Sequence, residues 1–119
     1  MANYLFKKSF QLKTLKPTTY NDLWGYKGVF STIRIVGKKP KYILVHDHVK
    51  KINLSLRKLN INFILSEKEL SLLIFPFLHK IKKYDHLLRV AVNSKIISVS
   101  LRERLKPNTN FDATLFSYQ

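Results

Sequence analysis

The chain has 119 residues, 45% of them hydrophobic, so it is long enough for one domain with a core and leaves little room for a second. It carries 22 lysines and arginines against 7 aspartates and glutamates, and this net charge of +15 attracts polyanions. The absence of cysteine excludes disulfides and thiolate metal sites. No signal peptide or apolar stretch of membrane-spanning length is apparent, which favours a cytoplasmic protein with no membrane partner.

The N-terminal quarter of the chain predicts one strand followed by a loop. Tyr4, Phe6 and Phe10 alternate with polar neighbours, and this period of two predicts a strand over residues 3–9. Residues 11–27 are rich in turn-forming residues and predict a loop.

A hairpin and a helix are predicted next. The β-branched and aromatic run over 29–36 indicates a buried strand, and the turn at 37–40 leads to a partner strand over 41–45. Asp47 is the predicted N-cap of the helix, and Asn60 takes the left-handed conformation that ends it. The apolar face of this helix consists of Val49, Ile52, Leu56 and Leu59.

A second helix is predicted to begin at Ser66, where Glu69 completes a capping box. Pro76 lies inside its apolar pattern and should kink or split it. The apolar positions of this helix are Leu70, Leu73, Phe77, Leu78 and Ile81.

The remaining sequence predicts a second hairpin. Residues 87–92 and 96–101 are strands on either side of a turn at 93–95, and residues 113–118 form a last strand or the start of a connection. Because hairpins dominate this order, we expect an α+β domain: a mostly antiparallel sheet with two helices packed on one face.

Catalytic and metal-binding patterns within the chain are sparse. His46, Asp47 and His48 offer two imidazoles at one place, but no third ligand stands at a zinc spacing. A capping aspartate flanked by two hydrogen-bonded histidines explains them better. The sequence contains neither a nucleophile elbow nor a phosphate-binding glycine loop, so no catalytic residue and no metal site is assigned.

The positive charge raises nucleic-acid binding as an alternative function. Such a site needs a basic face interleaved with exposed aromatics, whereas Phe30, Phe77 and Phe116 stand at alternating or helical positions that predict core packing. The basic residues are also scattered along the chain, which is typical of a solvated surface. A small basic nucleic-acid-binding protein therefore stays the second interpretation.

Three segments resemble the N-terminal domain of the fold-type IV (class IV) pyridoxal-phosphate enzymes. Residues 28–34, GVFSTIR, match a strand of the type G-x-F-E-T-x-R, and residues 48–52, HVKKI, match a helix of the type H-x-x-R-L. Residues 88–90, LRV, match a later strand of that family. The family includes branched-chain and D-amino-acid aminotransferases and aminodeoxychorismate lyase, and the resemblance covers roughly residues 20–101.

The resemblance implies that residues 1–119 are a single small domain, lacking the C-terminal domain that carries the catalytic lysine. The chain would then be inactive alone, because imine chemistry needs a desolvated lysine facing the cofactor. Its partners would be the missing lysine domain or a second subunit of a homodimer. The resemblance implies pyridoxal 5'-phosphate as cofactor, and an amino acid or aminodeoxychorismate as substrate.

Four site residues carry over from the family pattern. Lys51 stands where the family has the arginine that grips the cofactor phosphate, and lysine keeps the charge but loses the bidentate fork. Phe30 and Tyr26 would line the substrate pocket, and Arg89 would bind a substrate carboxylate. Ser31 departs from the usual glutamate of the strand motif.

Overall fold

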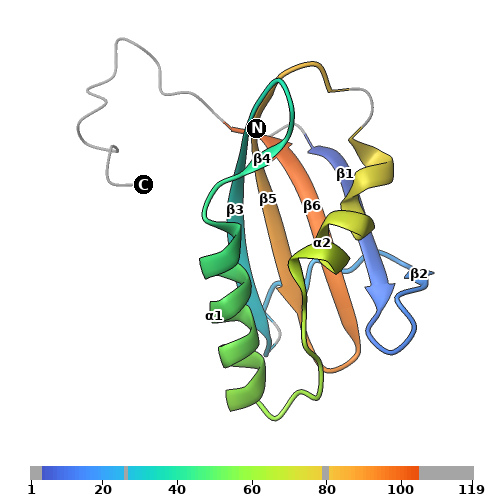
Figure 1. Ribbon diagram of the computed structural model, residues 1–119. Helices are drawn as coiled ribbons and strands as arrows, with labels where there is room; N and C mark the ends of the chain where they lie inside the picture. The colour runs from blue at the N-terminus through green and yellow to red at the C-terminus, as the bar shows by residue number, and fades with distance from the viewer. Residues whose placement is uncertain (1–3, 26, 79–80, 105–119) are drawn as a thin grey trace.

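The computed structural model describes residues 4–25, 27–78 and 81–104, which form a six-stranded antiparallel sheet with two helices on one face (Figure 1). The strands are β1 (Tyr4–Gln11), β2 (Pro17–Thr18), β3 (Val29–Gly37), β4 (Lys41–Tyr42), β5 (Tyr84–Val92) and β6 (Ile96–Glu103). Their order across the sheet is β2-β1-β6-β5-β3-β4. The predicted α+β class is confirmed.

Two helices and a short 3-10 segment connect β4 to β5. The helices are α1 (Val45–Lys58) and α2 (Glu67–Ile74), and the 3-10 segment η1 (Phe75–Phe77) follows α2. No helix in the described part of the chain is long and apolar enough to cross a membrane.

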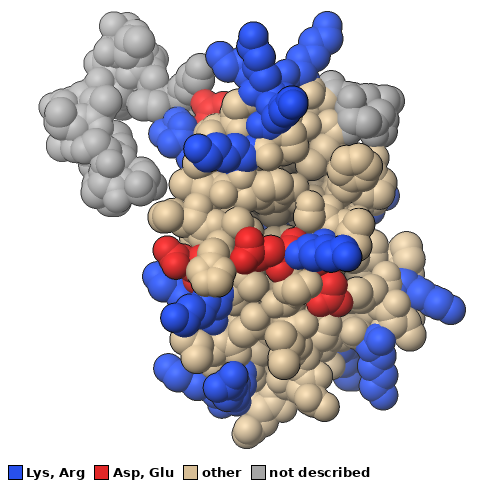
Figure 2. Space-filling view, in the orientation of Figure 1, with Lys and Arg blue, Asp and Glu red and all other residues tan. Residues whose placement is uncertain are grey.

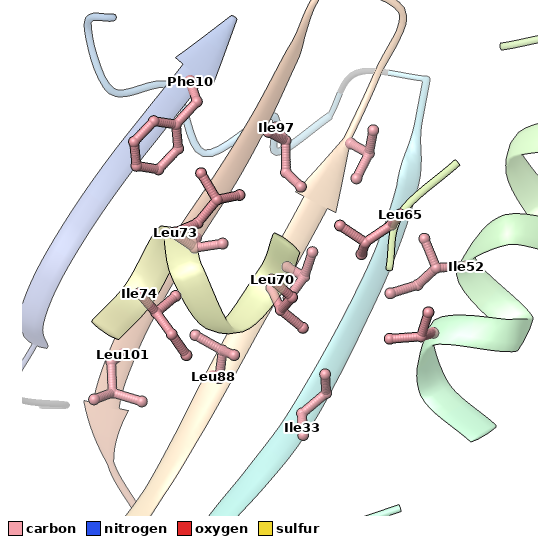
Figure 3. Close-up of a cluster of buried hydrophobic side chains, with 14 of the residues drawn as sticks. Phe10, Ile33, Ile52, Leu65, Leu70, Leu73, Ile74, Leu88, Ile97 and Leu101 are labelled. Atoms are coloured by element: carbon pink, nitrogen blue, oxygen red, sulfur yellow. The ribbon is translucent and has the colours of Figure 1, made fainter. Parts of the chain in front are cut away.

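The core lies between the helices and the sheet (Figure 3). Ile33 of β3, Leu88 of β5 and Leu101 of β6 are fully buried, because alternate residues of each strand point toward the helices. Ile52 of α1 and Leu70 of α2 close the core from the other side. The apolar faces of the helices and of the sheet therefore pack against each other in one layer.

The start of α1 differs from its prediction. The helix begins at Val45, and its N-cap is Leu44 in a left-handed conformation with no side-chain cap hydrogen bond. Asp47 is therefore not the N-cap but an acidic residue of the first turn, where it still complements the helix dipole. The predicted partner strand over 41–45 shrinks to Lys41–Tyr42 for the same reason.

The end of α1 and the start of α2 follow their predictions. Asn60 has a φ of 59° just after α1. At the start of α2 the Glu69 N–H donates to Ser66 Oγ over 3.0 Å, and Ser66 Oγ donates to Glu69 Oε1 over 3.1 Å. Pro76 falls in η1, so the helical segment splits as expected. Residues 113–118 lie outside the described part of the chain.

Candidate functional site

One contact shows which face of the sheet the helices leave uncovered. We call this face the open face. Ser31 Oγ lies 3.0 Å from His48 Nδ1 of α1, so the odd-numbered residues of β3 face the helices and the even-numbered ones point away. Cross-strand pairing extends this alternation to the neighbouring strands. The open face thus carries Phe30, Thr32 and Arg34 of β3, Arg89 and Ala91 of β5, and Ser98 and Ser100 of β6.

Two residues predicted for the substrate pocket meet on this face. The guanidinium carbon of Arg89 lies 5.1 Å from the ring centroid of Phe30 and 6.0 Å from that of Trp24. Phe30 pairs with Ala91, and Arg89 pairs with Thr32, so Phe30 and Arg89 are diagonal neighbours on adjacent strands. The cation therefore lies between two aromatic side chains, an arrangement that holds an arginine by cation–π attraction.

The hydrogen bonds of Arg89 leave part of its guanidinium free. Nη1 donates to the backbone carbonyl of Asp22 over 2.6 Å. Nη2 is buried and has no hydrogen-bond partner. A buried N–H group without an acceptor is costly, and for a cation the acceptor of choice is a carboxylate or phosphate oxygen.

Phe30 is 44% exposed, so the prediction that it packs in the core is wrong. It lies on the same strand as the buried Ile33, but its side chain points to the opposite face of the sheet, because successive residues of a strand alternate between the two faces. Alternation in the sequence defines two faces of a strand, and only the position of the helices decides which one becomes core.

The segment before β3 crosses the open face and partly covers it. The Asn21 N–H donates to Ser9 Oγ over 3.0 Å, and Ser98 Oγ donates to the Asn21 carbonyl over 2.5 Å. Leu23 is only 1% exposed and has a φ of 61°. These contacts fix the Asp22 carbonyl in front of Arg89.

Tyr20 adds a polar group to the same region. Burial raises the pKa of its phenol above the ordinary value, while a hydrogen bond with Ser100 and the charge of Arg89 oppose this shift. Tyr20 therefore stays neutral at physiological pH and keeps its proton for hydrogen bonding.

Lys51 does not join this cluster. It is exposed on α1, and α1 packs on the opposite, helix-covered face of the sheet. Tyr26 lies outside the described residues. Of the three predicted site residues that the structure describes, it brings together Phe30 and Arg89 but not Lys51.

The two histidines of the possible metal motif have separate partners. His46 Nδ1 lies 3.1 Å from Glu67 Oε2 at the start of α2, whereas His48 contacts Ser31 of β3. Across the described ranges, no group of three or more His, Cys, Asp or Glu side chains is placed to hold a metal ion.

Sequence reasoning missed Trp24 and the Asp22 carbonyl. Asn21 and Asp22 signalled only a turn, and indeed their side chains accept from backbone N–H groups two residues on, at Leu23 and Trp24. The contact between Asp22 and Arg89 spans 67 positions in the chain, and nothing local predicts it.

The site is thus a partly buried arginine beside two aromatic rings, with one guanidinium nitrogen that is buried and has no hydrogen-bond partner. This chain was compared with protein-family models, with curated proteins and with solved structures, and none of them matched.

Proposed function

We propose that this chain is the small, substrate-facing domain of a fold-type IV pyridoxal-phosphate enzyme, an aminotransferase or an aminodeoxychorismate lyase. Its part in the reaction is to bind the carboxylate of the substrate. The observation that carries the proposal is the buried Nη2 of Arg89, which has no hydrogen-bond partner and lies beside Phe30; the family pattern assigns both residues to the substrate pocket.

A carboxylate satisfies this arrangement on physical grounds. An arginine binds a carboxylate through two parallel N–H···O bonds, and Arg89 has one nitrogen free and the other on a backbone carbonyl. The neighbouring Phe30 ring lowers the local dielectric, and this strengthens a charged hydrogen bond. The arrangement accordingly favours a substrate with an apolar part next to its carboxylate.

The described residues do not assemble a cofactor site. Lys51, the counterpart of the phosphate-binding arginine, lies on the helix side, while Phe30 and Arg89 lie on the open face. Within this proposal, the groups that would hold pyridoxal phosphate lie outside the described residues, on a lysine-bearing domain or a partner subunit. The chain itself contributes a wall and an anion contact and no covalent step.

An NMR titration tests this role directly. We expect 4-methyl-2-oxopentanoate, a 2-oxo acid with an apolar side chain, to shift the amide signals around Phe30 and Arg89 in a saturable way. Arg89→Gln should weaken this binding at least about tenfold, because a hydrogen bond to a charged group contributes about 1.5–3 kcal/mol.

Arg102→Gln is the matched control, because Arg102 is on the adjacent rung of the open face and the charge loss is identical. It should leave the affinity within about twofold, a difference below 0.5 kcal/mol. The proposal fails if the wild-type chain shows no saturable shifts, or if both variants lose affinity equally.

A further inference from the structure

One end of the sheet gathers a large share of the positive charge. Gly37 of β3 pairs with Tyr84 of β5, so the turn after β3 lies beside the segment that leads into β5. These two connections and the first residue of β4 carry five exposed lysines: Lys38, Lys39, Lys41, Lys82 and Lys83. Lysines and arginines project from this end, at the top of Figure 2.

Three arginines extend the charge from this end onto the sheet. Arg34 of β3 and Arg102 of β6 both pair with Leu87, so they flank it on the open face, and Arg104 follows the end of β6. We call the five lysines and three arginines the basic end. Asp85 and Glu103 are its acidic residues within the described ranges.

The acidic residues do not neutralise the basic end. Asp85 is the shared partner of two arginines, at 3.5 Å from Arg34 and 3.8 Å from Arg104. Both distances are long for a charge-assisted hydrogen bond, and each guanidinium has five donors. The side chains of Arg34 and Arg104 are 46% and 37% exposed, so both cations stay partly open to solvent.

A hollow in the basic end gives these charges a common focus. It has a volume of about 560 Å³, and its lining includes three cations, Arg34, Lys83 and Arg104, and two carboxylates, Asp85 and Glu103. The cations come from different elements and outnumber the carboxylates, so the concavity favours an anion.

We propose that the basic end binds the phosphodiester backbone of a nucleic acid. This function is separate from the proposed substrate wall, because Phe30 and Arg89 are not among the residues of the basic end. Eight cations along one strip supply the counterion release that drives such binding.

The shape of the basic end favours a flexible polyanion over a membrane surface. The lysines lie on connections at the end of the sheet, whereas Arg34 and Arg102 lie on its open face, so the charged strip turns a corner. A chain of phosphates can follow that corner, but a planar bilayer can contact only one side of it. Tyr4 is 46% exposed and pairs with Arg102, which places an aromatic ring beside the strip for a base to stack on.

Fluorescence anisotropy with a labelled single-stranded oligonucleotide tests the proposal. The variant Lys38→Gln/Lys39→Gln/Lys83→Gln removes three exposed cations of the basic end. We expect its affinity at low salt to fall at least about tenfold. The slope of log affinity against log salt should also become shallower by about 2, since each phosphate contact on a single strand contributes about 0.7.

The variant Lys50→Gln/Arg57→Gln/Lys58→Gln is the control, because it removes the same charge from exposed positions of α1. It should retain the wild-type slope and an affinity within about twofold. Circular dichroism melting confirms that both variants are folded.

Three outcomes overturn the proposal. One is the absence of salt-dependent binding by the wild-type chain, and another is an equal loss in the two triple variants. The third is tighter binding to phosphatidylserine vesicles than to the oligonucleotide, which would assign the basic end to a membrane surface. Because the carboxylate titration is decided by Arg89, which is not part of the basic end, its failure and the failure of this proposal are distinguishable.

Discussion

At the scale of single residues, Asn53 shows how one polar side chain holds a loop in place. Its Nδ2 donates to the Leu65 carbonyl and its Oδ1 accepts from the Leu65 N–H, both over 2.8 Å. The amide thus satisfies both backbone groups of a residue that is 1% exposed. This contact fixes the connection between α1 and α2 and places the Leu65 side chain in the core.

Asn53→Ala should lower the free energy of unfolding by about 2 kcal/mol, since it removes two hydrogen bonds and leaves two backbone groups without partners. Urea unfolding measures the change. Asn62→Ala, at an exposed position of the same connection, is the control and should change stability by less than about 0.5 kcal/mol. Equal losses in the two variants would contradict a specific role for Asn53.

Phe30 and Arg89 show which properties of single residues could not be predicted from the sequence. Sequence placed each of them on a strand, and both strands exist. It did not place Phe30 on the uncovered face, since that depends on where α1 packs. The partner of the Arg89 guanidinium comes from a loop crossing the sheet, and such a long-range contact has no signature in the local pattern.

At the scale of elements, the two helices differ at their N-termini. The predicted cap of α2 forms, whereas the predicted cap of α1 does not. The Ser66 side chain accepts from the Glu69 N–H, and Ser66 has the ordinary extended backbone conformation of an N-cap. α1 instead begins after Leu44, whose φ is 54°. A branched residue rarely adopts the left-handed region, so no sequence rule for leucine anticipates it. Tertiary packing overrides local capping preference there.

These two starts predict different responses to substitution. Ser66→Ala should cost about 1 kcal/mol of stability, because it removes a cap hydrogen bond. Asp47→Ala removes only a favourable charge from the first turn of α1, which is an effect that salt screens. Guanidinium chloride unfolding, itself at high ionic strength, measures both changes. We expect the Asp47→Ala change to be near zero, and a loss as large as that of Ser66→Ala would show that Asp47 caps the helix.

At the scale of the whole molecule, the sheet separates two environments. Its helix side is a continuous apolar core, while its open face carries arginines at the centre and at one end. The fold class and most of the order of elements were predictable because turns and periodicities repeat at short range. The two-residue strand β2, Pro17–Thr18, was missed, since it falls in the segment predicted as a loop. The distribution of charge was not, because the cations that meet at the basic end come from three distant parts of the chain.

His86 couples the stability of the whole domain to pH. It is 6% exposed on the helix side of β5, and its Nδ1 accepts from the Asp85 N–H over 2.9 Å. Burial lowers the pKa of His86 below its ordinary value, although Glu103 and Asp85 partly oppose this shift. In the unfolded chain the imidazole regains a pKa of about 6.5.

Between these two pKa values, the unfolded state therefore binds more protons than the folded state. The free energy of unfolding consequently decreases as pH falls below about 6.5. It levels off below the folded pKa of His86. Urea unfolding at a series of pH values measures this slope. His86→Phe keeps an aromatic ring in the site and should flatten the curve over that window. His46→Gln, which removes a histidine whose side chain is 79% exposed, is the matched control for the loss of one imidazole. Parallel curves for the wild-type and His86→Phe chains would show that the acid sensitivity arises elsewhere.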